Sequence, residues 1–283
     1  MNPADLKRTL RALDGVPENY LSLSREMLAH LGSPDPELRD ELIYRKLATW
    51  LFEGVFTPEE SREVLATLQD DEHLFYKLGE TGTDSVLCRS FSVLLIAPIV
   101  GRHREKAFLS AEEVAAVSRR VRMYLEGERD LRGYDPEKGW LHPVAHAADV
   151  LDELALCEEI GEAGLLALLE SVQKAAFTGI SVYAHGEDER LSHVVVNTAK
   201  RDILSEAQIL AWLTSFKDKA PTLENFPMPE SYHSFINIKH FLRTLYFSLL
   251  KDFGFLKSDS KEIKLRRVML SEIERVLLEL NKL

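Results

Sequence analysis

The sequence is poor in cysteine, and this scarcity excludes proteins held together by disulfides. Cys88 and Cys157 are the two cysteines among 283 residues. Two isolated cysteines give neither a disulfide framework nor the spacing of a metal-binding motif. Both stand in apolar, helical-looking stretches, so we expect small buried side chains in a reducing compartment.

Long hydrophobic runs are also missing. The most apolar stretch covers residues 93–100, which is far shorter than the roughly 20 residues that span a bilayer. We expect it to form a buried helix that is kinked or ended near Pro98. The first residues lack the charged and apolar regions of a signal peptide. These features predict a cytoplasmic protein without a membrane segment.

Basic residues are outnumbered. The chain has 35 Lys and Arg against 46 Asp and Glu, and its net charge is −11. The basic clusters at residues 102–104 and 266–267 are short. An acidic chain repels nucleic-acid phosphates and anionic lipid surfaces. We therefore expect no general binding to nucleic acids or membranes.

Helix signals fill the chain, whereas strand signals are almost absent. Asn2-Pro3 and Thr57-Pro58 each combine a helix cap with a proline in the first turn. Residues 194–196 are the best strand fragment, and three residues are too few to form a strand of ordinary length. Helices are predicted over residues 21–31, 37–52, 58–68, 84–100, 111–126, 141–157, 162–177, 188–200, 206–216, 231–253 and 261–280.

This pattern predicts an all-α fold in which residues 1–283 form a single domain. Consecutive helices joined by short loops can pack as antiparallel pairs, which indicates a HEAT-like α-solenoid. A compact irregular helical domain is the alternative, because no fixed sequence period is visible. Two longer connections, residues 127–140 and 217–229, are candidates for function because long loops inside a fold often carry it.

One polar cluster stands out near the middle of the chain. Pro143 fits only the first turn of a helix, so a helix should begin near residue 141 or 142. At about 100° per residue, His142, His146 and Asp149 then share one stripe, and an apolar face lies opposite. The cluster as a whole comprises Arg132, Tyr134, Trp140, His142, His146 and Asp149.

Three interpretations of this stripe stay open. It is the solvated face of an amphipathic helix, or His142, His146 and Asp149 are ligands of a divalent metal ion. In the third interpretation, the cluster forms a pocket for a small polar molecule or a peptide. The helix N-terminus and Arg132 would bind an anionic group there, and Tyr134 and Trp140 would provide aromatic walls.

Two later segments add candidate residues. Glu187 and Asp188 are most simply acids that stabilise the first turn of a helix. The functional interpretation is that they face the helix of His142 and His146 and contribute to the ligand site. In residues 237–246 the aromatic side chains have core spacing, and Asn237 and Arg243 are predicted to be buried and paired, because a buried arginine needs a partner.

These motifs resemble those of one protein family. Residues 132–134, 138–142 and 145–149 read Arg-Gly-Tyr, Lys-Gly-Trp-Leu-His and Ala-His-Ala-Ala-Asp, and they are similar to the signature of the bacterial domain of unknown function family 2785. Residues 90–92, 187–191 and 241–246 resemble its other motifs, so the resemblance covers most of the chain. Pro143 departs from the small residue expected there. The resemblance implies a bacterial, cytosolic, helical protein and assigns no activity.

The function predicted from these residues is binding of a small polar molecule or a peptide at the central cluster. A metal-dependent hydrolase is one alternative. A helical-repeat scaffold whose concave face binds another protein is a second alternative. A single cluster, rather than a stripe repeated along the chain, favours the pocket over the scaffold. The sequence leaves the oligomeric state open.

Overall fold

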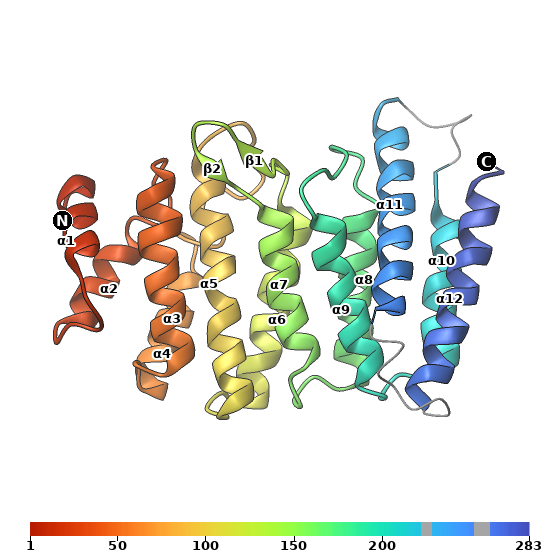
Figure 1. Cartoon of the computed structure of the whole chain (residues 1–283), viewed down its shortest axis with the longest axis horizontal. Coiled ribbons are helices and arrows are strands. Elements are labelled where there is room, and N and C mark those ends of the chain that lie inside the picture. The colour runs from red at the N-terminus through yellow and green to blue at the C-terminus, as the bar shows by residue number, and fades with distance from the viewer. Residues whose placement is uncertain (222–227, 252–260, 283) are drawn as a thin grey trace. The chain divides into compact units, whose positions relative to one another are not determined.

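A computed structural model describes residues 1–221, 228–251 and 261–282. These residues are mostly helical and contain one pair of two-residue strands (Figure 1), which confirms the all-α prediction. The chain forms two compact units, Met1–Glu153 and Leu154–Leu283. The single domain stays a prediction.

The first unit holds the amino-terminal helices and a small hairpin. Its strands β1 (Tyr134–Asp135) and β2 (Gly139–Trp140) pair antiparallel. Its helices are α1 (Pro3–Ala12), α2 (Tyr20–Leu28), the π-helix η1 (Glu37–Tyr44), α3 (Arg45–Glu53), α4 (Pro58–Leu68), α5 (Ser85–Glu105), α6 (Ala111–Gly127) and α7 (Pro143–Ala155), whose last two residues belong to the second unit.

The predicted helix starts follow from side-chain capping. Thr57 and Ser110 each accept a hydrogen bond from a backbone N–H of the first turn. In return, the Glu60 and Glu113 carboxylates accept the backbone N–H of the two cap residues. These capping boxes satisfy N–H groups that the helix itself leaves unpaired. Gly54 ends α3 with φ of 76°, a left-handed conformation that glycine adopts without strain.

Most residues of helix α5 are buried. It runs through Pro98 to Glu105, so the helix does not end near Pro98, and the alternative of a kink there stays a prediction. The helix packs against α3 and α4. The helix is long and apolar enough to cross a membrane, but 78% of its most apolar window is buried inside the structure. This burial is typical of the core helix of a soluble protein.

The second unit contains α8 (Glu162–Ala176), α9 (Glu187–Lys200), α10 (Glu206–Lys219), α11 (Glu230–Leu250) and α12 (Lys261–Leu280). Residues 194–196 lie in α9, as expected for a chain with few strands. Residues 222–227 of the predicted long connection lie outside the described residues. So do residues 252–253 of the predicted helix 231–253.

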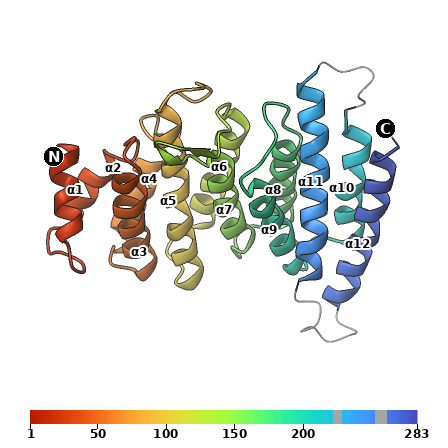
Figure 2. The same ribbon diagram turned by 45° about the horizontal axis from the view of Figure 1, so that its top comes forward.

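Alternate helices pack closely within each unit. Helix α3 lies beside α5 in the first unit, and in the second unit α9 lies beside α11 and α10 beside α12 (Figure 2). Consecutive helices are in contact in two places, α4 with α5 and α8 with α9, as expected where neighbouring helices pack as pairs. The HEAT-like repeat stays a prediction.

Candidate functional site

The central cluster is built around the hairpin of β1 and β2. The Asp135 carboxylate accepts hydrogen bonds from the backbone N–H groups of Glu137 and Lys138, at 2.9 Å each, which forms the turn. Gly139 has φ of 73°, and a Cβ there would lie 3.0 Å from Pro36. Strands of two residues are too short for alternation of side chains to be visible, so sequence reasoning missed the hairpin.

The buried side chain of Arg39 binds the backbone of this hairpin. Its side chain comes from η1 and is fully buried. Its guanidinium donates hydrogen bonds to the carbonyl oxygens of Lys138 and Trp140 and lies 4.7 Å from the ring centre of Phe91. Burial lowers the pKa of Arg39 to about 10. A buried cation is unfavourable unless its N–H groups are hydrogen-bonded. The bonds from Arg39 to the carbonyls of Lys138 and Trp140 therefore hold the hairpin in place. No sequence pattern marks Arg39 as part of the site.

Arg132 is bound within the chain. Its guanidinium donates two hydrogen bonds to the Asp130 carboxylate, at 2.7 and 2.6 Å, and one to the Thr83 carbonyl at 2.8 Å. The Asp130 side chain is nearly buried, and its hydrogen bond raises the pKa of Arg132. The Asp130 carboxylate thus occupies the two guanidinium N–H groups that an anionic ligand would use. Binding of an external anion by Arg132 stays a prediction.

A buried ion pair anchors the loop before the hairpin. The side chains of Arg89 and Glu128 have no exposed surface, and their two hydrogen bonds measure 2.7 and 2.9 Å. The Glu128 carboxylate also accepts the backbone N–H groups of Arg129 and Asp130. The pair was not predicted. The signal for it was an arginine within the apolar face of a helix, because such a charge needs a buried partner.

The aromatic side chains of the cluster form a continuous ladder. Tyr134 meets Trp140 edge to face with ring centres 4.9 Å apart, and Trp140 stacks on His142 at 4.3 Å. The His142 ring meets His146 at 5.7 Å, and His146 meets Phe91 at 5.3 Å. Tyr134 is 48% exposed and Trp140 41%. The structure thus brings four of the predicted site residues together, with the aromatic end facing solvent.

The backbone at His142 is unusual. Its φ is 47°, and residues with a side chain rarely adopt such values, especially before a proline. This conformation costs on the order of 1–3 kcal/mol. Two backbone hydrogen bonds stabilise this conformation. The His142 N–H donates to the Gly133 carbonyl, and the His142 carbonyl accepts the His146 N–H. Helix α7 then begins at Pro143, one or two residues after the predicted start, and the proline lies in its first turn as expected.

His146 belongs to the interior. It is 7% exposed, and its Nδ1 lies 2.7 Å from Ser90 Oγ and 3.3 Å from the Ser90 carbonyl. Ser90 Oγ donates its proton to the Leu141 carbonyl, so it accepts from Nδ1–H. Since Ser90 is itself fully buried, this is not a nucleophile and base arrangement. The solvated-face interpretation is wrong for His146.

The apolar side of α7 is buried, as predicted. Asp149 is half-buried, and Glu153 forms an ion pair with Arg104. In the described parts of the chain, no three His, Cys, Asp or Glu side chains are grouped so that they could hold a metal ion. The geometry of His142, His146 and Asp149 therefore gives a three-ligand metal centre no support. The buried apolar side comprises Val144, Ala147, Ala148, Leu151, Leu154 and Ala155.

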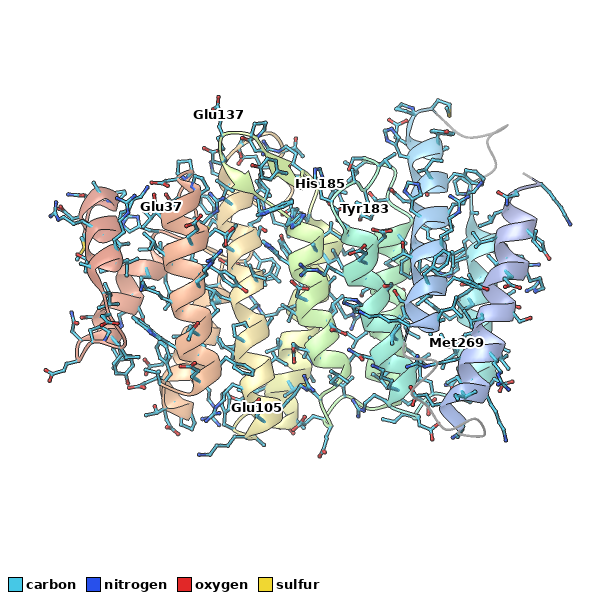
Figure 3. The ribbon with its side chains drawn as sticks, viewed as in Figure 1. Glu37, Glu105, Glu137, Tyr183, His185 and Met269 are labelled. Carbon is cyan, nitrogen blue, oxygen red and sulfur yellow. The ribbon has the colours of Figure 1, made fainter. Side chains whose placement is uncertain are left out.

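Glu187 and Asp188 lie in the second unit. Glu187 is 2% exposed, and its carboxylate accepts the His185 N–H at 2.8 Å in the loop before α9 (Figure 3). Asp188 accepts a hydrogen bond from the Thr244 hydroxyl. Both carboxylates thus organise the start of α9. Their contribution to the ligand site stays a prediction.

The predictions for α11 are half confirmed. Asn237 is buried and bonded to the Tyr183 N–H and to the carbonyls of Thr178 and Ser181. The prediction of a buried Arg243 is wrong. This residue is exposed because it lies on the outer face of α11, opposite the core positions.

Comparison with known proteins gives one family. The family described as "Protein of unknown function (DUF2785)" matches residues 74–247, a range that includes the hairpin, α7, the start of α9 and most of α11. No significant match is found among curated proteins or solved structures. Because the match covers more than half of the chain, the protein belongs to the family of unknown function DUF2785.

Proposed function

We propose that the protein is a binding protein that recognises a peptide segment of a partner protein through Tyr134 and Trp140. The observation that carries this proposal is the exposure of two aromatic rings on a hairpin fixed from below by Arg39. Tyrosine and tryptophan dominate the binding energy of protein interfaces. Rings that are already immobilised lose little conformational entropy on binding.

The shape of the hairpin favours a peptide over a small molecule. Small-molecule sites are concave and enclose most of the ligand. Glu137, in contrast, points outward from the tip of the hairpin, which projects at one end of the first unit's helices (Figure 3). A peptide segment of a partner protein can lie across a projecting aromatic pair and pack its side chains on the two rings.

Charged side chains surround the two rings and provide a polar rim. Lys138 pairs with Asp84, and Arg132 pairs with Asp130 beside the hairpin. Aromatic contacts at the centre with partly exposed charges at the edge are the usual anatomy of a protein interface. The rim pairs would affect the association rate and the choice of partner more than the affinity.

The compartment proposed for this activity is the cytoplasm. Cys88 and Cys157 are both free thiols, and free thiols are stable in a reducing compartment. The buried position of α5 supports a soluble protein.

Site-specific photocross-linking tests the proposal. A benzophenone amino acid replaces Glu137 at the hairpin tip, and Glu112, an exposed residue of α6 in the same unit, is the control position. We expect a defined adduct from position 137 and none from position 112. The cross-linked protein is identified by mass spectrometry, purified and titrated against the unmodified chain.

The second arm removes the rings. Tyr134→Ser with Trp140→Ser should abolish the adduct and weaken binding of the purified partner at least tenfold. Equal adducts at both positions, or binding that is unchanged without the two rings, would show that the hairpin is not the recognition element. An adduct with a second copy of this chain would also overturn the proposal.

A further inference from the structure

A second surface lies within the second unit, between α9 and α11. It is a hollow of about 470 Å³. Glu189 and His193 line it from α9, and Arg243, Phe247 and Lys251 line it from α11 and its C-cap. We name this hollow the cationic groove.

Two hydrogen bonds fix the walls of the cationic groove. The Thr244 hydroxyl donates to Asp188, and Ser192 and Ser248 share a hydrogen bond of 3.1 Å. Both bonds join residues 56 positions apart, so the two helices run in the same direction and in register. The groove is thus a preformed feature of the packing between α9 and α11, two helices in extensive contact.

The α11 wall has a regular pattern. Arg243, Phe247 and Lys251 are four residues apart, so neighbouring side chains are one turn apart, or roughly 6 Å. The two cations then stand roughly 12 Å apart with an aromatic ring between them. Phe247 is 68% exposed, which is a large solvent-facing surface for a phenylalanine.

The charge of the cationic groove is opposite to that of the chain. Among the lining side chains, Arg243 and Lys251 outweigh Glu189, whereas the whole chain carries −11. The Asp188 carboxylate does not line the groove and accepts the Thr244 hydroxyl. Within the described ranges, the side chains of Arg243 and Lys251 form no ion pair. Two cations beside an exposed ring therefore have their charge available for a partner.

We propose that the cationic groove binds an acidic peptide segment in extended form. Its central apolar side chain covers Phe247, and a carboxylate on each side pairs with Arg243 and Lys251. An extended chain advances about 3.3–3.6 Å per residue, so the two carboxylates belong to residues about four positions apart. This activity involves residues separate from Tyr134 and Trp140 and goes beyond the proposed function.

An anionic membrane is the competing occupant, and the structure favours the peptide. Lipid-binding surfaces use clusters of about four to eight basic residues, and this groove offers two. The chain's net charge of −11 repels an anionic bilayer. A hollow also accommodates a side chain better than a flat surface does.

The test uses a defined probe, the fluorescein-labelled peptide Gly-Glu-Ala-Leu-Ala-Glu-Gly, in which the two acids are four positions apart. The reference peptide has lysine in place of each glutamate. Fluorescence anisotropy at low ionic strength should show at least tenfold tighter binding of the acidic peptide to the full chain. Binding should weaken as salt is added.

Variants locate the binding. Arg243→Glu and Lys251→Glu should each weaken binding at least fivefold, and Phe247→Ser at least threefold. Lys264→Glu makes the same charge change at an exposed position of α12 outside the groove, and it should change binding less than twofold. Circular dichroism confirms that each variant folds.

Three outcomes would overturn the proposal. The acidic peptide binds no tighter than the basic peptide, or Lys264→Glu weakens binding as much as Arg243→Glu. In the third outcome, the acidic peptide does not bind, whereas vesicles containing phosphatidylserine bind the chain through Arg243 and Lys251. That result would assign the groove to membranes.

Discussion

The imidazole Nδ1 of His146 lies 2.7 Å from the hydroxyl oxygen of Ser90. This contact joins α7 to α5 in the interior of the first unit, and the same hydroxyl bonds the Leu141 carbonyl at the end of the hairpin. One serine therefore ties together the two helices and the loop that presents Trp140. The hydrogen bond also sets the tautomer of His146, because both of its Nδ1 neighbours act as acceptors.

We expect His146→Ala to lower the free energy of unfolding by roughly 2–3 kcal/mol, since the change leaves a small cavity and removes a partner of buried Ser90. Urea denaturation followed by circular dichroism measures the effect. His193→Ala is the matched control, because His193 is exposed on α9, and it should stay within about 0.5 kcal/mol of the parent protein. Equal effects of the two changes would contradict a structural role for His146.

Trp140 and Trp50 offer a matched pair of tryptophans. Trp50 is 4% exposed and Trp140 41% exposed. Trp50→Ala should cost about 3–5 kcal/mol, as expected for a core ring. Trp140→Ala should cost about 1 kcal/mol, because it loses mainly the stacking on His142. A cost at Trp140 as large as that at Trp50 would mean that the ring supports the fold and is not available for recognition.

Arg39 should determine the order of the hairpin. Arg39→Met keeps the length of the side chain but removes the hydrogen bonds to the carbonyls of Lys138 and Trp140, so we expect a loss of about 2–4 kcal/mol. Hydrogen exchange of the Leu141 amide, which bonds Gly133, should accelerate. Arg8→Met is the control, since Arg8 is largely exposed in α1. Unchanged exchange at Leu141 would show that other contacts hold the hairpin.

The helical fold was predictable because its signals are local. Thr57 and Ser110 cap their helices as the sequence indicates, and Pro143 marks the start of α7. Helix α5 continues past Pro98, although a proline removes a backbone hydrogen bond from a helix. Local sequence decides where helices begin, whereas packing decides whether they continue.

The sequence indicated which residues form the candidate site, but it did not indicate which buried residues hold them in place. Trp140, His142 and His146 could be selected because their types are unusual on a helix face. Arg39 lies about a hundred positions from the carbonyls it bonds, and no periodicity reveals such a contact. The burial of His146 likewise depends on α5, which the pattern of α7 alone does not show.

The metal interpretation has a direct measurement. Because the His146 ring is buried and its Nδ1 is bonded to Ser90, we expect the untagged native protein to contain far less than one equivalent of zinc, iron or manganese. EDTA should leave the melting temperature unchanged, since removal of a structural metal destabilises a protein. Stoichiometric metal that disappears in the His142→Ala, His146→Ala variant would contradict this expectation and favour the hydrolase.

Cys88 should make stability depend on pH in the alkaline range. Burial raises the pKa of its thiol from 9.0 to about 11. Between these values the unfolded chain loses the proton and the folded chain keeps it, so the free energy of unfolding falls as pH rises. Below about pH 9 both states are protonated, and this contribution is fully present.

The change Cys88→Ala isolates this effect, because Cys157 and all other groups are the same in both proteins. Urea denaturation at intervals from pH 6 to 11 gives the difference in unfolding free energy between parent and variant. The difference should be constant up to about pH 9, and above it the parent should lose stability relative to the variant. A difference that stays constant to pH 11 would mean that the folded state does not protect the thiol, and iodoacetamide would then modify Cys88 as fast in the folded protein as in urea.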